Sequence, residues 1–203
     1  IGDAAVGTNT MNVSLSHFHT LVSNHLGFSI APRSAYNLAC EMRPLLGEMF
    51  PCENPWVGWC DLDILIGKVD RVLMPFLVDY DIISGASYRV CGTLTIMRNV
   101  SYTTGLYRAA DMKAVFGDSE YKNFDEKGMT EVLLSKQRES PGSAGAFIRS
   151  WFSPLQYHDN LTGVGICWDA AGERLIEPAT KQEWLYYHFR HHGCWPNLER
   201  ASE

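Results

Sequence analysis

Two aspartates stand two residues apart, at Asp61 and Asp63, between the apolar runs 56–60 and 64–66. In an extended segment, residues i and i+2 project to the same side, so the two carboxylates converge on one point. Such charges repel each other and raise one pKa unless a cation lies between them. Because hard oxygen ligands suit Mg²⁺ or Mn²⁺, the spacing predicts a divalent metal site. The prediction fails if the side chains diverge or if an arginine or lysine already neutralises them; the alternative is a solvated loop end.

Two further clusters carry groups that can do chemistry. Asp125 and Glu126 follow Phe124 at the expected start of a helix, where the helix dipole favours acids. They are interpreted either as a plain N-cap or as a carboxylate base for an acceptor hydroxyl. His188 lies in the aromatic run 184–190. Neutral imidazole is a common metal ligand, and the alternative is a core histidine with its hydrogen bonds satisfied.

The elements that must position these groups follow from hydrophobic periodicity. Apolar spacing predicts helices over 14–26, 34–50, 103–116 and 126–134, and a short helix over 69–76. Ser14 or Ser16 is expected to cap the first helix and Gly27 to end it, while Pro44 kinks or begins the second. Asp125 is the expected N-cap of the last helix. Strands are expected over 56–60, 80–84 and 91–97. The run 56–60 lacks polar alternation, which is typical of a strand covered on both faces.

Composition limits the classes of protein. The chain has 203 residues, of which 46% are hydrophobic and 12% aromatic, enough for one buried core, so 1–203 is expected to be a single domain. The net charge of −6 argues against a nucleic-acid binder that depends on a broad basic face. No run of 18 or more uncharged apolar residues occurs, so no transmembrane segment is predicted.

Several segments occur in an order that resembles a known family. They are Cys40–Gly47 (CEMRPLLG), Trp56–Gly67 (WVGWCDLDILIG), Tyr80–Ser84, Gly92–Asn99, Phe124–Gly128 and Tyr186–Phe189. Together they resemble uncharacterised GT-A-type glycosyltransferase-like proteins of bacterial polysaccharide loci, some eukaryotes and some viruses. The resemblance implies an α/β fold with a GT-A-like, Rossmann-like mixed sheet flanked by helices. It also implies that the family's N-terminal nucleotide-binding portion would precede Ile1.

The resemblance implies a reaction and its residues. The chain would move a sugar from a UDP- or GDP-sugar donor to a glycan or another hydroxyl acceptor. Asp61, Asp63 and His188 would bind Mn²⁺ or Mg²⁺ against the donor diphosphate, where the metal offsets the charge of the leaving phosphate. Asp125 or Glu126 would bind or deprotonate the acceptor hydroxyl if the enzyme inverts.

The donor would also contact residues outside the metal motif. The resemblance places Arg43, Asp61 and Gly92 at the donor. Arg43 would face the diphosphate as a bidentate hydrogen-bond donor. Gly92 would let the backbone approach a substrate closely. Trp59 has two interpretations: it is a buried side chain of the strand, or its ring offers a stacking face for a sugar.

Two alternative functions stay open at the level of sequence. The segment 36–39 lacks the lysine that the family usually carries before CEMRP, and the N-terminal portion is not seen. Both departures favour a non-catalytic carbohydrate-binding or scaffolding remnant of the same fold. A phosphotransferase with an aspartate nucleophile also uses an acidic pair after a strand. That chemistry usually requires a small hydroxyl residue or valine shortly after the pair, whereas Ile64 to Ile66 follow here. The compartment, cytoplasmic or Golgi-lumenal, stays open.

Overall fold

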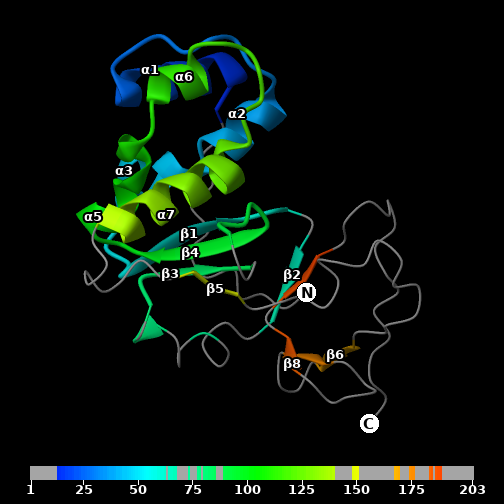
Figure 1. The fold of residues 1–203 in the computed structure, drawn as a ribbon. Coiled ribbons are helices and arrows are strands. Elements are labelled where there is room, and N and C mark those ends of the chain that lie inside the picture. The colour runs from blue at the N-terminus through cyan, green and yellow to red at the C-terminus, as the bar shows by residue number, and fades with distance from the viewer. Residues whose placement is uncertain are drawn as a thin grey trace.

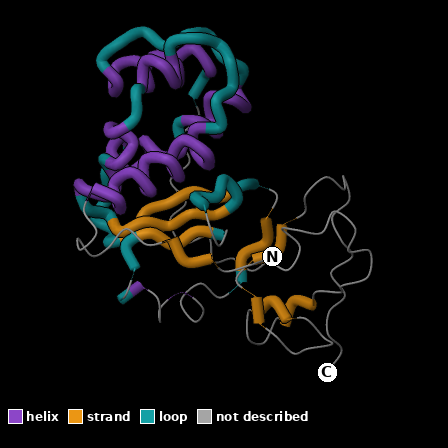
Figure 2. Tube along the Cα trace, viewed as in Figure 1, coloured by secondary structure: helices purple, strands orange, loops and turns teal. Residues whose placement is uncertain are grey.

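The protein has a mixed α/β fold in which helices cover one face of a four-stranded sheet (Figures 1 and 2). The computed structural model describes residues 13–62, 64–67, 73, 77–78, 80–85 and 89–139, and beyond them only the backbones of five short strands. One smaller sheet pairs Ile64–Ile66, which lies between two strands of the main sheet in the sequence, with Tyr186–His188, and the other is formed by three strands between residues 167 and 184. Among the described residues, no helix has the length and apolar character needed to cross a membrane.

The helical elements lie mainly between the N-terminus and residue 139. Their bounds are α1 (Leu15–Leu26), α2 (Ala35–Glu41), the 3₁₀ turn η1 (Arg43–Leu45), α3 (Leu46–Met49), α5 (Ser101–Thr104), the 3₁₀ turn η2 (Leu106–Ala109), α6 (Met112–Phe116), the π-helical turn η3 (Phe124–Gly128) and α7 (Met129–Glu139). The strands are β1 (Trp56–Cys60), β2 (Ile64–Ile66), β3 (Ile82–Ser84), β4 (Leu94–Arg98), β5 (Ile148–Ser150), β6 (Cys167–Asp169), β7 (Arg174–Ile176), β8 (Glu183–Trp184) and β9 (Tyr186–His188).

The first helix confirms the sequence-based expectation at both ends. The Ser14 hydroxyl accepts a hydrogen bond from the backbone N–H of His17, which satisfies one of the unpaired donors of the first turn. Gly27 ends the helix with a φ of 76°, and its N–H donates to the Ser23 carbonyl. Only glycine adopts this left-handed conformation at little cost, which is why the helix ends there.

The second predicted helix, over 34–50, divides at Pro44. Proline has no N–H to donate and disfavours a helical residue before it, so the i to i−4 ladder is interrupted. The chain passes from α2 through η1, in which Leu45 N–H donates to the Met42 carbonyl, and continues as α3. The break therefore falls at Arg43, the first residue of η1.

The helix predicted over 103–116 is wrong as one continuous element. It is three short pieces: α5, η2 and α6. Ala110 is extended, and the Asp111 side chain accepts hydrogen bonds from the N–H groups of Lys113 and Ala114, so a new helix begins at this cap. The apolar spacing persists across the break at Ala110 because η2 and α6 pack on the same core.

The main sheet has the strand order β1-β4-β3-β5. The pairs β1–β4 and β3–β4 are antiparallel, and β3–β5 is parallel. Strand β1 lies at an edge of the described sheet, so the expectation of a central strand covered on both faces is wrong. Within β1 only Trp59 is buried, and its indole N–H donates to the Cys91 carbonyl. Trp59 is thus a buried strand side chain, as one of its two interpretations expected.

The sheet separates two apolar clusters because side chains alternate along each strand. Ile82 and Met97 face the helices, where they join the core that includes Leu38, Tyr107 and Phe124. Their neighbours Ile83, Leu94 and Ile96 face the opposite side and pack with Leu73. The strands predicted over 80–84 and 91–97 are confirmed with shorter bounds. Most of the helix predicted over 69–76 lies outside the described residues.

Candidate functional site

The Arg43 guanidinium lies at the centre of a cluster of charged groups. Its Nη2 is 2.6 Å from Asp61 Oδ1, and its Nη1 is 3.0 Å from Asp125 Oδ2. Nη1 also donates to the Gly92 carbonyl at 2.9 Å. One cation therefore connects residues from η1, the end of β1, the loop before β4, and η3. The four residues were all singled out in the sequence, and the structure brings them together.

The end of β1 places Asp61 by continuing the pairing with β4. Beyond the last registered pair, Cys60 with Leu94, the Asp61 N–H donates to the Thr93 carbonyl at 2.9 Å. This bond holds Asp61 beside Gly92. The loop before β4 is held in turn by the Trp59 indole and by the Thr95 hydroxyl, both of which donate to the Cys91 carbonyl.

Asp125 and Glu126 lie in the π-helical turn η3 rather than at the N-terminus of an α-helix. The prediction that Asp125 is an N-cap is wrong. Its carboxylate accepts a hydrogen bond from Arg43, and α7 begins only at Met129. The turn starts after Asn123, a non-glycine residue with φ 54° and ψ 44°. Left-handed residues and π-helical turns both occur often at functional sites. Here they turn two consecutive acids toward one cavity.

Gly92 is required by the close packing of charged side chains around it. A Cβ built at Gly92 would lie 2.8 Å from Arg43 Nη1, 3.0 Å from Asp125 Oδ2 and 3.2 Å from Glu126 Oε1. Its N–H donates to Glu126 Oε1 at 2.9 Å, and Arg89 contacts the other oxygen of that carboxylate at 3.2 Å. The close approach expected at this glycine is thus made by the protein's own ionic groups.

These groups line a cavity of about 770 Å³ that we call the acidic cavity. Its wall includes Arg43, Asp61, Gly92, Asp125 and Glu126, together with the side chains of Tyr36 and Tyr121. A volume of this size is in the usual range of a small-molecule site. The acidic cavity lies where the carboxyl end of β1 meets α2 and η3.

Asp125 is the most perturbed group in the acidic cavity. The residue is 1% exposed, and its Oδ1 atom receives no hydrogen bond from another residue among those described. Burial raises the pKa of Asp125 to about 6, an effect that Arg43 opposes and Glu126 reinforces. A carboxyl group with this pKa exchanges a proton near neutral pH, which is the requirement for a general base.

Comparisons with known proteins give a family for the chain. A family profile matches residues 4–145, more than half of the sequence, and its description is a family of unknown function, DUF6625. The chain belongs to DUF6625. No curated protein matches it, and no solved structure matches it.

Two predicted metal ligands of this DUF6625 chain lie outside what the structure describes. They are Asp63 and the side chain of His188. The backbone of His188 is described in β9, where it pairs with Ile64, the residue that follows Asp63. Two segments more than 120 residues apart in sequence therefore meet beside the Asp61–Asp63 motif.

Two residues of the DUF6625 site were not predicted from the sequence. Tyr36 is 73% exposed although it is a large aromatic side chain, and Tyr121 is also exposed. Both line the acidic cavity. Charge and hydrogen bonding at Cys40 raise the pKa of Tyr36, while burial and then Asp125 raise the pKa of Tyr121. In the sequence, Tyr36 is only a single tyrosine two residues after the Ser34 helix cap. Hydrophobic periodicity does not distinguish such a residue from any other tyrosine on a helix.

Proposed function

We propose that the protein transfers a sugar from a nucleotide-sugar donor to a hydroxyl acceptor, in a GT-A-like domain. The observation that carries this proposal is the Asp125 residue, which lines the same cavity as Asp61 and has a buried oxygen, Oδ1, without a partner among the described residues. The order of the segments that resemble the glycosyltransferase-like family supports it. Membership in DUF6625 supplies no activity of its own.

Asp125 is suited to receive the acceptor proton. In an inverting transfer, the acceptor oxygen forms a bond to the anomeric carbon while the bond from that carbon to the phosphate oxygen breaks. The hydroxyl proton passes to Asp125 Oδ1, once this buried oxygen turns toward the cavity, and the nucleoside diphosphate leaves with the bonding electrons. Arg43 holds the other oxygen, Oδ2, and so fixes the direction of the base. Glu126, held by Gly92 and Arg89, is placed to orient the acceptor.

The expected cofactor is Mn²⁺ or Mg²⁺ at Asp61, Asp63 and His188. The described residues do not make up such a site by themselves: they contain no group of three or more His, Cys, Asp or Glu side chains that could hold a metal. Asp61 already pairs with Arg43 through Oδ1. A metal ion at Asp61 would therefore share or replace that contact.

The Arg43–Asp61 ion pair favours a second candidate function. It neutralises one member of the acidic pair, whose charge a metal site would need. A carbohydrate-binding protein of the same fold, without catalysis, needs no metal and is compatible with this pairing. The two functions differ in whether nucleotide binding exists and depends on a divalent cation.

Calorimetry with UDP and GDP, in the presence of Mn²⁺ and then of EDTA, separates the two functions. Glycosyl transfer predicts that one nucleotide binds with Mn²⁺, that EDTA abolishes the binding, and that Asp63→Ala does the same. Glu139→Gln, a change on the exposed end of α7, is the matched control and should bind as the native chain does. Absence of nucleotide binding to the full-length protein under all conditions would contradict the proposal, and metal-indifferent glycan binding would establish the alternative.

A further inference from the structure

We propose that the acidic cavity, acting in the glycosyl transfer proposed above, receives an uncharged sugar ring against Tyr36 and Tyr121 and rejects acidic sugars. This names the acceptor class of the site and rests on the proposed function. It assigns Tyr36 and Tyr121 to substrate binding. It also assigns Asp61, Asp125 and Glu126 a selective role through their combined charge.

The charge balance of the acidic cavity disfavours an anion. Three carboxylates, Asp61, Asp125 and Glu126, line it, and the guanidinium groups that contact them among the described residues are those of Arg43 and Arg89. Counted over these described side chains, the cluster is net negative. Arg43 directs its Nη1 and Nη2 toward two carboxylates and a carbonyl, so its charge is already compensated. Without a bound metal ion, a sugar carboxylate brought into this cavity would meet like charge at reduced dielectric.

The same wall suits a neutral molecule that carries many hydroxyl groups. Asp125 Oδ1 is buried and lacks a partner among the described residues, and a rotation of the Asp125 side chain toward the cavity would let a ligand hydroxyl donate to it and remove the cost of leaving that acceptor unpaired. The carboxylate of Glu126 offers further acceptor capacity at the cavity wall. Sugars have the matching surplus of hydroxyl donors.

Two tyrosines supply the apolar part of the contact. Tyr36 projects from the first turn of α2 with 73% of its surface exposed, and Tyr121 lies on the loop before η3. Large exposed aromatic side chains mark binding surfaces when they gather at one cavity, because a flat ring buries a wide area at low entropic cost. The C–H face of a pyranose ring fits such a surface. Leu62, 98% exposed, extends the same rim.

Ligand-detected NMR and calorimetry on the full chain at neutral pH, with EDTA present, test this selectivity. The probes are methyl glucoside and methyl galactoside, each compared with its uronic acid counterpart. We expect at least one neutral glycoside to bind and its acidic counterpart to bind at least about tenfold more weakly, as one uncompensated charge requires. Asp61→Asn, which removes one negative charge, should narrow that ratio.

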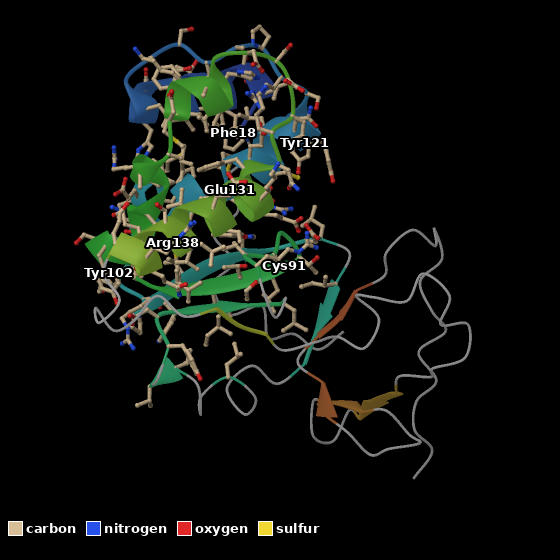
Figure 3. The ribbon with its side chains drawn as sticks, viewed as in Figure 1. Phe18, Cys91, Tyr102, Tyr121, Glu131 and Arg138 are labelled. Carbon is tan, nitrogen blue, oxygen red and sulfur yellow. The ribbon has the colours of Figure 1, made fainter. Side chains whose placement is uncertain are left out.

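Variants of the tyrosines test the stacking surface. Tyr36→Ala should weaken binding of the neutral glycoside by about fivefold or more, whereas Tyr36→Phe, which keeps the ring, should retain most of it. Tyr102→Ala is the matched control: Tyr102 is also exposed but lies at the opposite end of the helical layer from Tyr121 (Figure 3), and its loss should leave binding unchanged.

Three results would overturn the inference. They are equal binding of neutral and acidic sugars, unchanged binding in Tyr36→Ala, and no binding of any of the four glycosides. None of them bears on nucleotide binding. A chain that binds UDP or GDP with Mn²⁺ but shows no selectivity for neutral glycosides therefore keeps the proposed function and loses this acceptor class. A chain that selects neutral glycosides and binds no nucleotide is the carbohydrate-binding alternative.

Discussion

Arg43 determines the charge balance of the acidic cavity at the scale of single residues. It contacts both Asp61 and Asp125. Its positive charge lowers the pKa of Asp125, which burial and Glu126 raise. A guanidinium suits this role because its planar fork offers several N–H donors to carboxylates in fixed directions.

Replacing Arg43 should therefore change the ionisation of Asp125. In Arg43→Gln we expect the pKa of Asp125 to rise above its value of about 6, because the favourable charge is lost while burial remains. Arg43→Lys keeps the charge but contacts the two carboxylates less well, and should give an intermediate pKa. A ¹³C NMR titration of the Asp125 carboxyl group measures the shift. An unchanged pKa in Arg43→Gln would show that Arg43 does not control this group.

Asp125 should also make the stability of the protein depend on pH. Its pKa is about 6 in the folded chain against an ordinary value of 3.8, so the folded state binds the extra proton between those values. The free energy of unfolding should fall as the pH rises through this window, by about 3 kcal/mol for this group. Asp125→Asn lacks this component. Urea unfolding from about pH 4 to about pH 7 should show the native protein losing stability relative to Asp125→Asn; parallel curves would contradict the assignment.

Breaks in the regular secondary structure position the residues of the site. Pro44 ends the helical ladder where Arg43 must turn toward β1, and Asn123 turns the chain into η3 where Asp125 and Glu126 must face the cavity. Both are local departures from regular helix. The acidic cavity therefore depends on two irregular turns more than on the helices beside them.

The backbone at Asn123 can be tested separately from its side chain. Asn123→Ala should destabilise the protein by about 1 kcal/mol, because an alanine Cβ opposes the left-handed conformation. Asn123→Gly removes more of the side chain yet should cost less, since glycine adopts this conformation freely. Thermal unfolding followed by circular dichroism compares the two. Equal losses in both variants would assign the effect to the Asn123 side chain, which accepts a hydrogen bond from Tyr121.

Sequence patterns predicted those features that depend on near neighbours. The Ser14 cap, the Gly27 end and the break at Pro44 each follow from the conformational preference of one residue and its adjacent turn. The contact between Asp125 and Arg43 did not follow, because the two residues are 82 positions apart in the sequence. An acid after a phenylalanine fits an N-cap equally well until the fold places a guanidinium beside it. The charged candidate residues were named from the sequence, but their contacts with one another were not, and Tyr36 and Tyr121 were missed.

At the scale of the whole molecule, a second buried ion pair joins the helices. Arg33 and Glu41 both have fully buried side chains and contact each other. Arg33 also donates to the Asp118 carbonyl at 2.8 Å and lies over the Phe116 ring. The pair fastens the segment after α6 to α2. That segment leads directly to Tyr121 and η3, so the wall of the acidic cavity depends on a contact outside it.

Removing one partner of this buried pair should be costly. Arg33→Met leaves the Glu41 carboxylate buried without its counter-ion, and we expect the free energy of unfolding to fall by about 3 kcal/mol or more. The double variant with Glu41→Leu should recover part of that loss. Lys136→Ala, which breaks the exposed pair with Glu139, should cause no measurable change. Urea unfolding measures all three. Equal stability of Arg33→Met and Lys136→Ala would contradict the structural role of the pair.

The central claim is that the acidic cavity carries out sugar transfer from a nucleotide donor, with Asp125 as its base. Its most direct test is the release of UDP or GDP from a panel of nucleotide sugars by the full-length protein with Mn²⁺ or Mg²⁺, with and without added glycoside acceptor. We expect release from at least one donor, stimulation by an uncharged acceptor, and loss of that stimulation in Asp125→Asn while nucleotide binding remains. Acceptor-dependent release that persists unchanged in Asp125→Asn, or no release from any donor, would contradict it.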